Sequence, residues 1–316
     1  MKYNYFEKKL HDICLGNKLI KKSLYELEIL LFLNRQEKNN KNRHVFITGL
    51  PRSGTTMLLE YIYNSENFSS LKYLDMPFVM SPNFYSKISK KKNINKVERM
   101  HSDAVFYDLD SPEAFEEVFF TTFKNNWQEK IVDYVNLIIT RYGNKRYLSK
   151  NNYNFQRLNE LEKIFPNSKF VIPFRDPLSH ATSMMKQHEN FCFEQKKDNF
   201  TLRYTNYLGH YEFGLNHKPW FSPKKFDDTQ NINYWLEQWV LFYQNILDRN
   251  KYLKNLIMVC YEDFCEKSEY RKKINFELSI DNQEFIVNNK RTHETKVVNS
   301  QLLNKCNDVY IELKKI

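Results

Sequence analysis

The stretch HVFITGLPRSGTT at residues 44–56 constrains the fold of this chain more than any other part of the sequence. Residues 45–47 are an apolar, β-prone run, and the glycine, proline and serine residues of 49–54 then interrupt regular structure. Apolar side chains recur at helical spacing in the MLLEYIY segment that follows. The order predicts a buried strand, a tight loop and a helix start. Such a loop presents backbone N–H groups and the positive end of the helix dipole to one point, which predicts a phosphate-type anion site.

The loop has P-loop spacing but differs from a nucleotide-hydrolysing P-loop at one position. Gly49 is followed by four residues and then by Gly54, which is the P-loop skeleton. Thr55 stands where such a loop carries lysine, and the cation lies earlier, as Arg52. Because that lysine grips the β- and γ-phosphates of ATP, its absence disfavours ATP hydrolysis. An ATP- and magnesium-dependent small-molecule kinase stays the alternative within this fold.

The composition limits the class of protein. With 316 residues and 41% hydrophobic content, the chain can bury the core of one large α/β domain. The formal net charge of +10 favours anionic ligands, but the lysines are scattered among asparagines, so we expect no nucleic-acid surface. The five cysteines form no CxxC pair, which predicts neither a disulfide framework nor a zinc site.

The sequence shows no segment that predicts a membrane span. Its N-terminus carries charges throughout and has no apolar run of signal-peptide length, and EILLFL is far too short to cross a bilayer. We therefore expect a cytoplasmic protein in a reducing compartment, with peripheral contact at a membrane surface left open. The oligomeric state is left open as well.

The remaining pattern predicts a single α/β domain over residues 1–316, with a central, mostly parallel sheet flanked by helices. A helical arm is expected over residues 1–38 and a helical tail over 267–316. The segments RYLSK, NFQRLNELEKIF and KFVIPF predict a strand, a helix and a parallel strand, and LIMVC predicts another strand. Residues 71–75 predict a strand that places Asp75 at its carboxyl end, where open α/β sheets bind ligands.

Residues 82–145 are less regular and are interpreted as an insertion. Within them, SPEAFEEVFF predicts a helix start, with Ser111 as the cap, Pro112 in the first turn and Glu113 near the positive dipole end. This structural role explains Glu113 as well as a catalytic role does.

A second candidate anion site lies far downstream of the first. Arg175 directly follows KFVIPF, and Ser183 lies eight residues later, on a helix opened by Pro177. A fixed guanidinium at a strand end and a hydroxyl two turns along the next helix can hold a phosphate. Capping and pairing by Arg175 and Asp176 explain the same residues, so the segment alone leaves both interpretations open.

Together, GLPRSGTT and RDPLSHATS resemble the paired 5′-phosphosulfate and 3′-phosphate motifs of sulfotransferases that use 3′-phosphoadenosine 5′-phosphosulfate (PAPS). The spacer from KNNYNF to FRDP also resembles the linking segment of the bacterial, glycan and tyrosylprotein branches. The resemblance covers roughly residues 44–265. It implies a P-loop-like three-layer α/β fold with helical and loop insertions, metal-independent sulfuryl transfer from PAPS as co-substrate, and 3′-phosphoadenosine 5′-phosphate (PAP) as product.

The resemblance implies roles for individual residues. Arg175 and Ser183 match the 3′-phosphate ligands, and Asn152 stands where the cytosolic branch has its catalytic histidine. The C-terminal glycine-bearing loop of the family is matched only loosely, by Lys290 and Arg291. The positions that match the ligands of the 5′ end are Pro51, Arg52, Ser53, Gly54, Thr55 and Thr56.

The acceptor hydroxyl needs a general base, and Arg52 with the loop amides would stabilise charge on the leaving oxygen. Asp75 lies 23 residues after Arg52, where glycan sulfotransferases carry a carboxylate base, and it is the first candidate. His101 is second, because histidine titrates near neutral pH, and Glu113 is third. Strand-end capping is the alternative role for Asp75.

The acceptor is the least constrained part of the prediction. Positive charge and the aromatic-rich segment after the second motif favour a glycan or glycolipid, and a lipid head group or a peptide tyrosine fits the same features. Residues 82–145 are expected to shape the acceptor site. A non-catalytic nucleotide-binding relative is the alternative from another class.

Overall fold

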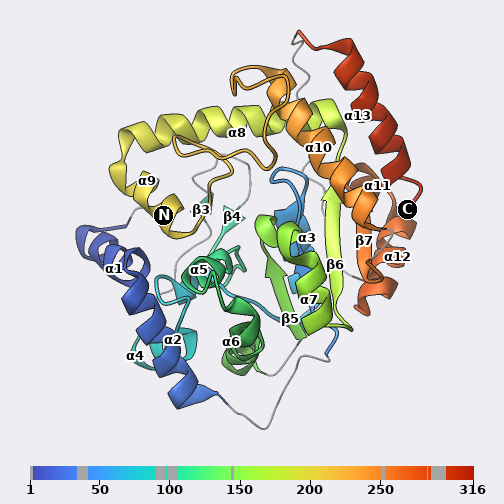
Figure 1. Ribbon diagram of the computed structural model, residues 1–316. Coiled ribbons are helices and arrows are strands. Elements are labelled where there is room, and N and C mark those ends of the chain that lie inside the picture. Colours follow the sequence, from blue (N-terminus) through green and yellow to red (C-terminus); the bar gives the residue numbers. More distant parts are fainter. Residues whose placement is uncertain are drawn as a thin grey trace.

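The computed structural model describes residues 3–33, 42–89, 97–98, 106–143, 146–250, 253–282, 284–285 and 297–316. A five-stranded parallel sheet in the order β2-β5-β1-β6-β7 lies at its centre (Figure 1). A separate antiparallel pair joins β3 to β4. The strands are β1 (Val45–Ile47), β2 (Phe68–Ser69), β3 (Val97–Glu98), β4 (Phe106–Tyr107), β5 (Arg146–Lys150), β6 (Lys169–Phe174) and β7 (Leu256–Cys260). The predicted α/β fold with a parallel sheet is confirmed.

Helices cover both faces of this sheet and extend beyond its edges (Figure 1). In the N-terminal half they are α1 (Tyr5–Gly16), α2 (Lys18–Phe32), α3 (Thr55–Tyr63), the 3₁₀ turn η2 (Tyr73–Asp75), α4 (Pro82–Ile88), α5 (Glu117–Thr122) and α6 (Trp127–Tyr142). In the C-terminal half they are η3 (Asn152–Arg157), α7 (Leu158–Ile164), α8 (Pro177–Lys197), α9 (Asn199–Tyr207), α10 (Ile232–Asn250), α11 (Tyr261–Glu266), α12 (Ser268–Leu278) and α13 (Ser300–Leu313).

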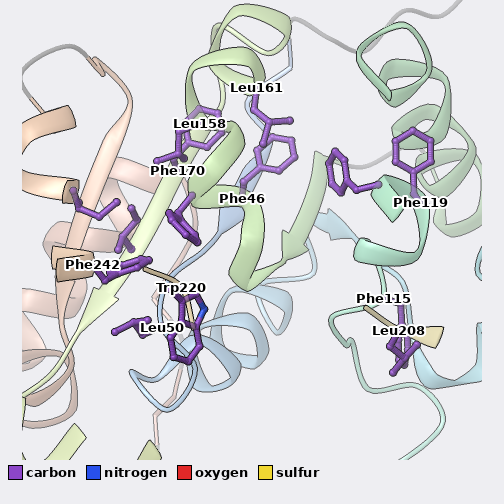
Figure 2. Close-up of a cluster of buried hydrophobic side chains, with 14 of the residues drawn as sticks. Phe46, Leu50, Phe115, Phe119, Leu158, Leu161, Phe170, Leu208, Trp220 and Phe242 are labelled. Carbon is purple, nitrogen blue, oxygen red and sulfur yellow. The ribbon is translucent and has the colours of Figure 1, made fainter. Parts of the chain in front are cut away.

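The alternation of side chains along β1 explains the three layers. Val45 and Ile47 belong to a core shared with α3, α11 and α12, whereas Phe46 points to the opposite face. On that face the ring of Phe46 stacks on Phe170 of β6, with centroids 5.4 Å apart (Figure 2). Because every residue of β1 is fully buried, both faces of the strand need a covering layer of helices.

The N-terminal arm consists of two helices, which break at Asn17. The Asn17 side chain accepts from the N–H groups of Leu19 and Ile20, so it caps α2 just as α1 ends. Helix α1 packs against α9, and α2 packs against α4 and α6. Figure 1 shows α8 crossing from the sheet towards α9, so the arm lies at the far end of this helix. Among the described residues, no helix combines the length and the apolar character that a membrane crossing needs.

The prediction of a strand over residues 71–75 is wrong. The second strand lies earlier, at Phe68–Ser69, because its pairing with β5 covers only these positions. Residues Tyr73–Asp75 instead form η2, in which the Asp75 carboxylate accepts from the N–H of Lys72 over 2.9 Å. Asp75 therefore lies in a 3₁₀ turn and not at the end of a strand.

The helix start predicted at Ser111 is also wrong, since α5 begins at Glu117. The Ser111 hydroxyl is bonded to Asp108 within a preceding turn, so it does not cap a helix. The following backbone pairs with the segment before η2, through a bridge between Lys72 and Pro112 and through the N–H of Glu113. This pairing keeps the segment non-helical for several more residues.

The junction of α2, α4 and α6 depends on a buried carboxylate, and it gives the first testable prediction. Glu28 is fully buried and accepts from the N–H groups of Asn83 and Phe84 and from the Asn83 side chain, at 2.6–2.9 Å. Glu28→Ala leaves these donors unsatisfied, so we expect it to lower the free energy of unfolding by about 3 kcal/mol in urea titrations. The matched control is Glu26→Ala on the same helix, since Glu26 is exposed and makes a surface pair with Lys130. Equal effects of the two substitutions would contradict this account.

Candidate functional site

The order of the sheet brings the predicted anion motifs together. Strand β1 lies between β5 and β6 and is parallel to both, so the loops after all three strands emerge at one edge. Ligands of open α/β sheets bind at this edge, where the order of the strands reverses. The loop after β1 carries Arg52, β5 ends in Lys150, and Arg175 follows β6.

The loop between β1 and α3 has an unusual backbone path. Gly54 has a φ of 106° and Arg52 a φ of 72°, which is rare for a residue with a β-carbon. The Ser53 hydroxyl donates to the carbonyl oxygen of Leu50 over 2.7 Å and closes the turn. Gly54 is the cap residue of α3 and has no side chain, so no side-chain cap competes for the first-turn N–H groups of that helix. This is the arrangement that suits a bound anion.

Tyr261 lies against both anion motifs, although the sequence did not single it out. A β-carbon added at Gly54 would lie 2.7 Å from a ring carbon of Tyr261. The guanidinium carbon of Arg175 lies 4.9 Å from the centroid of the same ring. The sequence feature that could have identified Tyr261 is its position directly after β7, at the edge of the sheet that carries the motifs.

Helix α8 contacts the loop at two positions on one of its faces. The Arg52 Nε donates to the Ser183 hydroxyl over 3.2 Å, across 131 residues of sequence. One turn earlier, His180 Nε2 lies 2.9 Å from the carbonyl oxygen of Pro51. The two motifs that the sequence predicted separately are therefore in direct contact.

The start of α8 is held by two carboxylates. Asp176 caps the helix by accepting from the N–H of Ser179 over 2.9 Å. Its own N–H donates to Glu262 over 3.0 Å, and the other oxygen of Glu262 accepts from Tyr310 of α13. Hydrogen bonds that involve α11 and the C-terminal helix α13 therefore fix the backbone next to Arg175.

Lys150 connects the loop helix to a buried carboxylate. Its ammonium group donates to the Thr56 hydroxyl over 3.0 Å and to Glu113 over 3.2 Å. Both members of the pair are buried, and Glu113 also accepts from the N–H of Ala114 and from the Tyr73 hydroxyl at 2.6 Å. Lys150 is the last residue of the predicted strand RYLSK and had no predicted role, whereas Glu113 was the third candidate for the base. The structure brings both to the predicted anion site.

Asp75, the first-ranked base, has different surroundings. It is fully buried, and one oxygen accepts from the Tyr142 hydroxyl at 2.5 Å and from the N–H of Lys72. The Nε of Arg141 lies 3.8 Å from the other oxygen. Burial raises the pKa of Asp75 to about 6, and the bond from Tyr142 opposes the rise. These contacts join η2 to the end of α6.

Three residues that the sequence predicted for the site, His101, Lys290 and Arg291, lie outside the described residues. Glu116 is buried and accepts from the hydroxyls of Tyr147 and Ser149 and from the Asn154 amide, so it links the segment before α5 to β5 and η3. Within the described ranges, no three His, Cys, Asp or Glu side chains lie together as a potential metal site.

Comparison with known proteins identifies the family. The model of the family described as "Sulfotransferase family" matches residues 44–218, which is more than half of the chain. The chain belongs to the sulfotransferase family. The matched region contains the loop after β1, Glu113, Lys150 and the Arg175–Ser183 motif, whereas Tyr261 lies beyond it. The resemblance predicted from the two motifs is confirmed, and membership supports a sulfotransferase enzyme.

Solved structures of sulfotransferases share the fold. Sulfotransferase STF1 from Mycobacterium tuberculosis aligns with a TM-score of 0.51 and 13% identity over 96% of this chain and 81% of its own. Sulfotransferase STF9 from Mycobacterium avium aligns with a TM-score of 0.50 and 10% identity over 98% of this chain and 78% of its own. A search of curated proteins finds no match. At such low identity these likenesses concern the fold alone.

The raised pKa of Asp75 predicts a pH-dependent stability. Because the folded-state pKa of about 6 lies above the ordinary 3.8, the contribution of Asp75 is present below pH 3.8 and is lost as the pH rises through 6. At about 1.4 kcal/mol per pKa unit, the loss is about 3 kcal/mol. Asp75→Asn cannot titrate, so urea unfolding from about pH 3 to pH 7 should show wild type losing this amount relative to the variant. Parallel pH curves would contradict the prediction.

Proposed function

We propose that this chain transfers the sulfuryl group of PAPS to an acceptor hydroxyl. The observation that carries the proposal is the contact between Arg52 and Ser183, which joins two anion motifs into one site. A donor that is negatively charged at both its 5′ and 3′ ends requires two such motifs side by side. Family membership supports the same reaction class.

The proposed donor site uses the two motifs for opposite ends of the nucleotide. Arg52, the loop amides and the first turn of α3, which includes Thr55 and Thr56, would hold the 5′-phosphosulfate. Arg175 and Ser183 would hold the 3′-phosphate. Tyr261 contacts Gly54 and Arg175, so it would lie where the nucleotide passes from one motif to the other.

Glu113 is the general base in this proposal, in place of Asp75. Glu113 is bonded to Lys150, and Lys150 to Thr56 of the loop helix, whereas the bonds of Asp75 lead to α6. The Glu113 carboxylate takes the proton of the acceptor hydroxyl as the acceptor oxygen forms a bond to sulfur. The bond from sulfur to the phosphate oxygen breaks, and PAP and a sulfate ester are the products. Arg52 and Lys150 neutralise the charge that develops on the leaving oxygen, without a metal ion.

The proposed acceptor class is based on the charge and the composition of the chain. The net charge of +10 and the aromatic-rich segment after α8 favour a polar or anionic sugar, so we propose a glycan or glycolipid. Purified protein, sulfur-labelled PAPS and cell extracts divided into glycan, lipid and peptide pools provide the test. Label in the glycan pool, or on glycolipids of the lipid pool, supports the proposal, and label only in peptides or small phenols contradicts this acceptor. Magnesium-dependent phosphoryl transfer from ATP, with no sulfuryl transfer, would favour the kinase alternative instead.

Arg52→Ala should strongly lower the labelling of every pool, because it removes a cation that the mechanism assigns to the leaving oxygen. The expected loss is at least about a hundredfold, in the range of an electrostatic transition-state contribution. The Arg52 side chain is only partly buried, so the midpoint of thermal unfolding should change little. A variant that retains full transfer would overturn the mechanism.

The choice of base is tested with two isosteric variants. Glu113→Gln should lower kcat about 10²–10⁴-fold, because the amide cannot accept the proton. Asp75→Asn serves as the matched control and should keep kcat within about threefold of wild type, since its bonds are structural. Loss of kcat in Asp75→Asn with near-normal kcat in Glu113→Gln would restore the original ranking.

A further inference from the structure

His180 belongs to the second motif and lies on the face of α8 that meets the loop after β1, where it bonds to a backbone carbonyl. It is fully buried, and its Nε2 lies 2.9 Å from the carbonyl oxygen of Pro51. A carbonyl oxygen can only accept, so Nε2 carries the proton and donates. The ring centroid of His180 lies 6.4 Å from that of Tyr243, whose hydroxyl donates to Pro173 of β6. The His180 ring, which donates the hydrogen bond to Pro51, therefore packs beside a tyrosine that is bonded to the sheet.

The carbonyl that receives this bond belongs to the peptide that leads into Arg52. A peptide group is planar, so the orientation of the Pro51 carbonyl sets the orientation of the Arg52 nitrogen and thereby restricts φ of Arg52. That φ is 72°, a conformation that a residue with a β-carbon adopts only when its surroundings hold it. The hydrogen bond from His180 therefore restrains the peptide plane between Pro51 and Arg52, whose orientation restricts φ of Arg52.

We propose that His180 is a positioning residue for sulfuryl transfer, whose hydrogen bond to Pro51 holds the Arg52 backbone in its left-handed conformation and so aims the guanidinium at the leaving group. The catalytic part of this inference rests on the function proposed above. Ser183, one turn along α8, contacts the Arg52 side chain directly, whereas His180 acts through the backbone. The two roles are separable by mutation.

His180 does not act as an acid or base in this arrangement. Burial lowers the pKa of His180 to about 3, and the positive charges of Arg175 and Arg52 act in the same direction as burial. The ring is therefore neutral across the working pH range. A substitution that preserves the donor should leave the pH profile of kcat unchanged.

The test uses His180→Gln, which keeps an N–H donor at a similar reach, and His180→Leu, which keeps bulk without a donor. With sulfur-labelled PAPS and the acceptor pool that wild type labels, His180→Leu should lower kcat about tenfold or more and change the KM for PAPS less than kcat. His180→Gln should recover most of the activity. In an Arg52→Ala background, His180→Leu should have no further effect, because His180 acts through Arg52.

Wild-type kcat in His180→Leu, or additive effects with Arg52→Ala, would overturn the proposal. A general folding defect is recognised because it lowers the thermal midpoint and appears equally in the Arg52→Ala background. Nitrogen-15 spectra of histidine-labelled protein give a readout without activity: the expected signal is an Nε2–H tautomer that does not titrate from about pH 5 to 9. An Nδ1–H tautomer or a titrating ring would overturn the proposal even if wild type proves inactive with PAPS, a result that would itself contradict only the proposed function.

Discussion

The position of β1 between β5 and β6 is the constraint on which the site depends. All three strands run parallel, so their carboxyl ends meet, and each end delivers one cation: Arg52, Lys150 and Arg175. These residues are scattered over more than a hundred positions of sequence. The stacked rings of Phe46 and Phe170 and the buried faces of the strands fix the register that brings them together.

Three cations at one edge of a sheet repel one another, and the protein balances them with specific partners. Glu113 pairs with Lys150, the Tyr261 ring lies beside Arg175, and the Ser183 hydroxyl accepts from Arg52. Of these three partners Glu113 is the anion, so the three cations and their partners together keep a net positive charge. The donor proposed above, with anionic groups at both ends, would suit such an edge.

Local pattern predicted most of the sheet correctly. Three strands, VFI, KFVIPF and LIMVC, are short and largely apolar runs because the sheet is buried on both faces, and RYLSK has the apolar pair Tyr147 and Leu148, so neighbouring residues carry the signal. The second strand and the start of α5 were placed wrongly because pairing with distant segments decided both. The second strand follows its register with β5, and the segment after Ser111 pairs with residues near Lys72. No local pattern contains such information.

The sequence by itself determined the strand, loop and helix start of the two predicted anion motifs, because these elements are encoded by adjacent residues. Only the tertiary structure decided which carboxylate lies beside them. Glu113 meets Lys150 across 37 residues, and Asp75 meets Tyr142 across 67. Spacing from Arg52 favoured Asp75, but its surroundings depend on how α6 packs. A side chain's partners are set by the packing of elements distant in sequence, and no spacing along the chain records that packing.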